Sequence, residues 1–72
     1  MNFVQFTFEN KENFDKAKKL IEHHTVKVLH ESTKNRAIAI ASKAEATFFS
    51  LKLESGKIPY TFTVKGDKDE SH

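Results

Sequence analysis

The first hydrophobic pattern along the chain has a period of two residues. In FVQFTF, at residues 3–8, the side chains of Val4, Phe6 and Phe8 fall on one side of an extended chain. This alternation predicts a β-strand with one buried face. After Asn10, which can cap a helix N-terminus, the apolar spacing becomes helical and predicts an amphipathic helix that ends near residue 23. Its apolar arc consists of Phe14, Ala17, Leu20 and Ile21.

The period of two returns after this helix, in two segments separated by turn-forming residues. TVKVLHE at residues 25–31 and RAIAIAS at residues 36–42 both alternate, and STKNR between them favours a turn. We therefore expect a β-hairpin. Its second strand places Ile38 and Ile40 on one face and a row of small side chains on the other. That row consists of Ala37, Ala39 and Ala41.

The segment that follows supports two predictions. Ser42 and Glu45 have the spacing of a capping box, and Gly56 is a typical helix stop, so a helix is expected between them. The alternation of apolar residues over 46–53 fits a strand instead, which would form a hairpin with the next segment and change the order to βαββββ. We favour the helix and keep the strand as the alternative.

The last alternating segment, IPYTFTVKG at residues 58–66, predicts a final strand. The order βαββαβ, with right-handed crossovers, predicts a four-stranded antiparallel sheet with both helices on one face and the first and third strands in the centre. This α+β arrangement resembles the ferredoxin-like fold, an architecture that does not by itself indicate a function. We expect one domain over residues 1–66 and a disordered charged tail over residues 67–72.

Composition narrows the class of protein. The chain has 72 residues, of which 38% are hydrophobic and 31% charged, which fits one small globular domain with little room for a deep pocket. It contains no cysteine, which excludes disulfides, thiolate metal sites and thiol nucleophiles. The longest apolar run, AIAIA at residues 37–41, is far too short to span a membrane, and the N-terminus does not resemble an export signal. We expect a cytoplasmic protein.

Three of the four histidines lie close together in the sequence, which raises the question of a metal site. His23 and His24 are adjacent on the predicted helix and diverge by about 100°, whereas ligands on one helical face need a spacing of three or four residues. His30 follows six residues after His24 in an extended segment, about 20 Å further along. We therefore expect no bound metal and interpret His24 as a partly buried residue at the helix C-terminus.

Motifs that carry chemistry are absent from the sequence. None of its serines lies in a G-x-S-x-G setting, and its two glycines form no phosphate-binding loop. No pair of carboxylates has a spacing that indicates general acid and base chemistry. We expect a protein that is not an enzyme and that needs no cofactor.

The sequence pI of about 9.0 makes nucleic-acid binding worth considering. The basic residues available near the predicted hairpin are Lys27, Lys34, Arg36 and Lys43. The predicted open face of the sheet carries only one aromatic residue, Phe3, so base stacking on that face is not indicated. Nucleic-acid binding is our second hypothesis.

Two apolar surfaces favour a protein partner. In the predicted second helix, Ala44, Phe48 and Leu51 form one stripe, and a second stripe is turned from it by about 150°, which is too wide an arc for one packing surface. The second stripe consists of Ala46, Phe49 and Leu53. The alanine row of the hairpin is the other surface, because small side chains allow another sheet or helix to approach closely.

The leading hypothesis is a small protein-interaction module that acts as a homodimer or as a regulator or inhibitor of a larger protein, for instance as an accessory protein of a phage or a bacterial operon. Phe49 with Leu53, or Leu29 with the alanine row around Ala39, would form the buried centre of the interface. Lys34, Arg36 and Lys52 would form its polar rim. A small ligand held between paired domains is a third possibility.

Overall fold

The computed structural model describes residues 3–65 and has the predicted element order. Its elements are β1 (Phe3–Thr7), α1 (Lys11–His24), β2 (His30–Ser32), β3 (Ala37–Ile40), α2 (Lys43–Ser55) and β4 (Thr61–Lys65). The four-stranded sheet has the order β2-β3-β1-β4, so the predicted ferredoxin-like α+β arrangement is confirmed. The helical prediction for α2 is confirmed and the strand alternative over 46–53 is wrong. The predicted tail lies outside the described residues.

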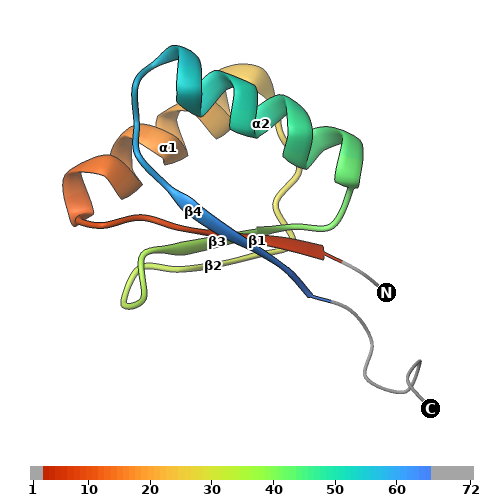
Figure 1. Cartoon of the computed structure of the whole chain (residues 1–72), viewed down its shortest axis with the longest axis horizontal. Coiled ribbons are helices and arrows are strands. Elements are labelled where there is room, and N and C mark those ends of the chain that lie inside the picture. Colours follow the sequence, from red (N-terminus) through yellow and green to blue (C-terminus); the bar gives the residue numbers. More distant parts are fainter. Residues whose placement is uncertain (1–2, 66–72) are drawn as a thin grey trace.

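Both helices lie on the same face of the sheet (Figure 1). The strand β1 pairs antiparallel with β3 on one side and with β4 on the other. In this register Phe6 lies opposite Ile38 of β3 and Phe62 of β4. Because residues opposite each other in a sheet point to the same face, these three side chains all face the helices.

Short polar side chains start each helix, as the sequence predicts. The Asn10 side chain accepts a hydrogen bond from the Asn13 amide at 2.9 Å, and the Ser42 hydroxyl accepts one from the Glu45 amide at 3.3 Å. Such caps satisfy amide groups of the first helical turn that have no partner within the helix. The helix α1 ends one residue later than expected, at His24, and Thr25 follows it in the left-handed region with φ 56°.

The hydrophobic core fills the space between the sheet and the two helices. Phe6 of β1 packs edge-to-face against Phe49 of α2, with ring centroids 5.0 Å apart, and Phe8 packs against Phe14 of α1 at 6.2 Å. The largest fully buried side chains are Phe6, Phe8, Phe14, Ile38, Ile40, Phe49 and Leu53.

Two strands, β2 and β4, begin several residues later than predicted. The segment expected to begin a strand at residue 25 joins the sheet only at His30. Val26 packs into the core instead, and the Lys27 amide donates a hydrogen bond to the Glu45 carboxylate of α2 at 3.0 Å rather than to a strand. At the other shortened strand, the Ile58 amide donates to the Leu53 carbonyl at 2.9 Å, so this segment closes the end of α2 before β4 begins.

Candidate functional site

The edge strand β4 carries two large apolar side chains that the helices do not cover. Phe62 and Val64 lie opposite Phe6 and Val4 of β1 and therefore face the helix side of the sheet. They are nevertheless 58% and 59% exposed. They are exposed because α2 packs over the neighbouring strands β1 and β3, whereas β4 lies at the edge of the sheet and is not covered by α2 (Figure 1).

A groove with a volume of about 150 Å³ runs between α2 and β4. Its floor is formed by Val4 and Phe6 of the sheet, and its outer wall by Phe62 and Val64. The side of α2 completes the groove with Lys43, Ala46, Thr47 and Ser50. A smaller hollow shares Val4, Lys43 and Val64 with the groove and continues it to Phe3 and Ala41. The molecule therefore has a largely apolar channel beside an exposed strand edge.

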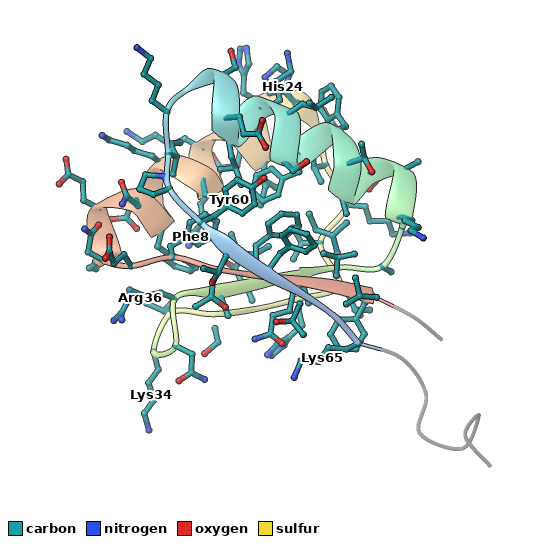
Figure 2. All side chains as sticks on the ribbon, in the orientation of Figure 1. Phe8, His24, Lys34, Arg36, Tyr60 and Lys65 are labelled. Atoms are coloured by element: carbon teal, nitrogen blue, oxygen red, sulfur yellow. The ribbon has the colours of Figure 1, made fainter. Side chains whose placement is uncertain are left out.

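Tyr60 closes one end of this groove. It lies between α2 and the start of β4 (Figure 2), and its hydroxyl donates a hydrogen bond to the Glu54 carboxylate at 2.9 Å. Its ring centroid is 5.5 Å from that of Phe6 and 6.3 Å from that of Phe62. Burial, followed by the hydrogen bond to Glu54, raises the pKa of Tyr60 above its ordinary value. The ring of Tyr60 thus forms an aromatic wall at this end of the groove.

The two edges of the sheet differ in how they are protected from other chains. Edge strands usually avoid unwanted pairing by being short or by carrying charge. The strand β2 spans only His30–Ser32, and its Glu31 forms an ion pair with Lys18 of α1 at 3.6 Å. The strand β4 is longer, and its residues 61–64 carry no charge, so Lys65 at its end is the only charged residue in the strand. Within residues 3–65, the edge at β4 is therefore the one without such protection.

The prediction that Phe49 and Leu53 supply an exposed binding centre is wrong. They are 1% and 0% exposed and, with Ala46, attach α2 to the sheet. The uncovered stripe of α2 is the opposite one, where Phe48 is 39% and Leu51 is 58% exposed. Both stripes have the same helical period, so periodicity alone does not indicate which one faces the sheet.

Lys52 belongs to a cluster between the two helices, away from the groove. Its ammonium group lies 5.3 Å from the centre of the Phe48 ring, and the His24 ring packs edge-to-face on the same ring at 5.5 Å. Partial burial, then the charge of Lys52 and that of His23, lower the pKa of His24. Figure 2 places His24 on the helix layer, on the side away from the sheet.

The open face of the sheet holds the other predicted surface. Ala39 is only 5% exposed, because it forms the floor of a hollow of about 320 Å³ whose walls include Phe3, Gln5 and Leu29. Leu29 is 45% exposed, so a partner on this face would meet Leu29 before the alanine row. His30, opposite Ala39 in the sheet, also lines the hollow. An uninterrupted alternation over residues 25–31 would place His30 on the same face as Val26 and Val28, but the strand begins only at His30.

The predicted basic residues do not form one patch. Lys34 and Arg36 belong to the turn between β2 and β3, at the end of the sheet away from Lys65 (Figure 2). Arg36 is partly buried there, and its Nε donates a hydrogen bond to the Phe8 carbonyl at 3.1 Å. Lys43 begins α2 after the far end of β3, and the Lys27 amide is bonded to the same helix.

Within residues 3–65, no three histidine or carboxylate side chains are grouped so that they could hold a metal ion. In the same range, neither helix is long and apolar enough to cross a membrane.

Sequence reasoning missed Phe62 and Val64 as site residues. The alternation of the last strand is visible in the sequence, and the register with β1 places Phe62 and Val64 on its helix-facing side. The signal that would have identified them is topological, because the last strand of this fold lies at an edge of the sheet. The sequence matches no known protein-family model and no curated protein, so the site is interpreted from its own geometry.

Proposed function

We propose that this protein is a non-enzymatic protein-binding module, and that it binds an extended segment of a partner by adding a strand to the edge of β4. The observation that carries the proposal is the coincidence of an unprotected strand edge with an apolar groove on its helix side. In strand addition, backbone hydrogen bonds supply affinity, and pockets for alternate side chains supply specificity.

The geometry of β4 defines the partner segment. A strand added along Thr61–Lys65 would place every second side chain beside Phe62 and Val64 on the groove side. Its other side chains would lie on the open face beside Thr61 and Thr63. The partner strand should therefore alternate apolar and polar residues, with no positive charge next to Lys65.

Peptide selection tests this proposal without requiring that the partner be identified. Random peptides displayed on phage and selected on the folded protein should yield segments with alternating apolar residues. The selected peptides should lose binding to Val64→Lys, whose introduced charge faces the groove, and should bind Leu51→Lys normally. Leu51 is the matched control, since its exposure of 58% nearly equals that of Val64, but it lies outside the groove.

Chemical shifts of the backbone amides would locate the binding site. We expect bound peptides to perturb the amides of β4 and of the α2 residues that line the groove. Peptides that perturb Leu51 and Phe48 instead, and whose binding survives Val64→Lys, would refute the proposal. We do not propose nucleic-acid binding as a second function, because the four basic residues named for it divide between two separate places in the fold, the β2–β3 turn and the start of α2.

A further inference from the structure

We infer that the strand bound at β4 is β4 of a second copy of this chain, antiparallel to the first about a two-fold axis at Thr63. This inference rests on the proposed function and names its partner.

The sequence of β4 is complementary to itself. Its midpoint is Thr63, so an antiparallel pairing centred there overlaps all of Thr61–Lys65 with the same segment of the second copy. Phe62 then lies opposite Val64, and Thr63 lies opposite Thr63 of the second copy. Aromatic residues opposite β-branched residues, and threonine opposite threonine, are favourable cross-strand pairs. The only charged side chain, Lys65, meets the neutral Thr61.

The same two-fold pairing would cover the apolar side chains of β4 that are exposed in a single copy. A two-fold axis perpendicular to the sheet keeps the helices of both copies on one side and joins the two sheets edge to edge. The grooves beside the two β4 strands then become one channel, in which Phe62 and Val64 of each copy cover those of the other. These are the residues that each copy alone leaves 58% and 59% exposed.

The opposite edge of the sheet lacks this property. An antiparallel pairing of β2 with itself would be centred on Glu31 and would place two carboxylates directly opposite each other. Like charges in that position are destabilising. Glu31 also already pairs with Lys18. The charges of the chain therefore select β4 over β2 as the edge for self-association.

The chain's own C-terminal residues are a poorer occupant of the groove. Residues 66–72, GDKDESH, contain no apolar side chain that could lie beside Phe62 and Val64. A second copy of β4 supplies two such side chains in the required alternation. The chemistry of the groove thus favours a second copy over this segment.

Sedimentation velocity over a range of concentrations tests the inference on the full chain. The wild-type protein should reach twice the mass of one chain as its concentration rises. Thr63→Lys, which sets two ammonium groups face to face on the axis, should weaken association by about fivefold or more. Thr63→Glu should do the same, and mixing the two variants should restore association as a heterodimer.

Thr33→Lys is the matched control, because Thr33 is an exposed turn residue away from β4. It should associate as the wild type does. Circular dichroism of the Thr63 variants should match that of the wild type, since Thr63 is exposed and a charge there does not enter the core.

Two results would overturn the inference in different ways. A mass of one chain at all concentrations, with peptide binding still lost in Val64→Lys, would reject the second copy while leaving the proposed strand addition intact. A dimer that persists in Thr63→Lys but dissociates in Leu51→Lys would reject β4 as the interface, and the proposed function would then depend on the peptide selection alone.

Discussion

At the scale of single residues, His24 shows how a helix terminus responds to its neighbours. A histidine at a helix C-terminus is normally stabilised in its charged form by the helix dipole. Here partial burial, then the charge of Lys52 and that of His23, favour the neutral form and lower the pKa of His24. Because the folded pKa lies below the unfolded value near 6.5, the unfolded chain binds more protons in the interval between them. The contribution of His24 to stability is therefore present above pH 6.5 and is lost as the pH falls through the folded pKa.

We predict that Lys52→Met raises the pKa of His24 towards its ordinary value and reduces the loss of stability on acidification. The measurement is an NMR titration of the His24 ring, together with urea unfolding from about pH 8 to about pH 5. Lys34→Met is the control, since Lys34 lies in the turn between β2 and β3 (Figure 2). An unchanged pKa of His24 in Lys52→Met would contradict this account.

At the scale of elements, the end of α1 stores backbone strain. Thr25 has φ 56° and ψ 44°, a left-handed conformation that is unfavourable for a β-branched residue and that glycine adopts without cost. The conformation is retained because it ends the helix: the Thr25 amide bonds to the Ile21 carbonyl, and the Val26 amide bonds to the same carbonyl at 3.1 Å. The turn then sends Val26 into the core.

We predict that Thr25→Gly stabilises the protein by about 0.5–1 kcal/mol. This net change is the free energy gained by relieving the left-handed strain, minus the entropy cost of the more flexible unfolded chain. Urea unfolding at constant pH measures this change. Thr33→Gly should not stabilise, because Thr33 is not among the residues with positive φ. Equal stabilisation by both substitutions would show that strain at Thr25 is not the cause.

At the scale of the whole molecule, one layer of core joins the sheet to both helices, and α2 contributes through one side only. Phe49 lies inside that layer against Phe6, and the neighbouring Phe48 lies on the outside. Two adjacent phenylalanines therefore contribute differently to stability, because the fold buries Phe49 and leaves Phe48 partly exposed.

We predict that Phe49→Ala costs about 3–5 kcal/mol of unfolding free energy, the usual loss for a buried phenylalanine. Phe48→Ala should cost much less, because its side chain is already 39% exposed. Denaturant unfolding of both variants measures the difference, and a Phe49→Ala chain that is largely unfolded agrees with the prediction. Similar losses for the two variants would contradict the assignment of the buried stripe.

The order of the elements, the helix caps and the inward side of each long strand were determined by the sequence itself. These features depend on local chemistry: a period of two residues or of a helical turn, and a short polar side chain at a helix start. The Ser42 hydroxyl caps α2 as predicted, whereas the Glu45 carboxylate accepts a hydrogen bond from the Lys27 amide instead of completing a capping box. Val4, Phe6 and Ile38 face the helices.

Only the tertiary structure decided which apolar residues stay exposed. Phe49 and Phe48 belong to two stripes of α2 with the same helical spacing, yet Phe49 is buried and Phe48 is exposed. Phe62 faces the helices as Phe6 does, yet Phe6 is buried and Phe62 is exposed. Burial depends on lateral position under the helices, which the pattern along one strand does not contain. Because α2 packs over β1 and β3, the edge strand β4 is left with its apolar side chains uncovered, and there the candidate site arises.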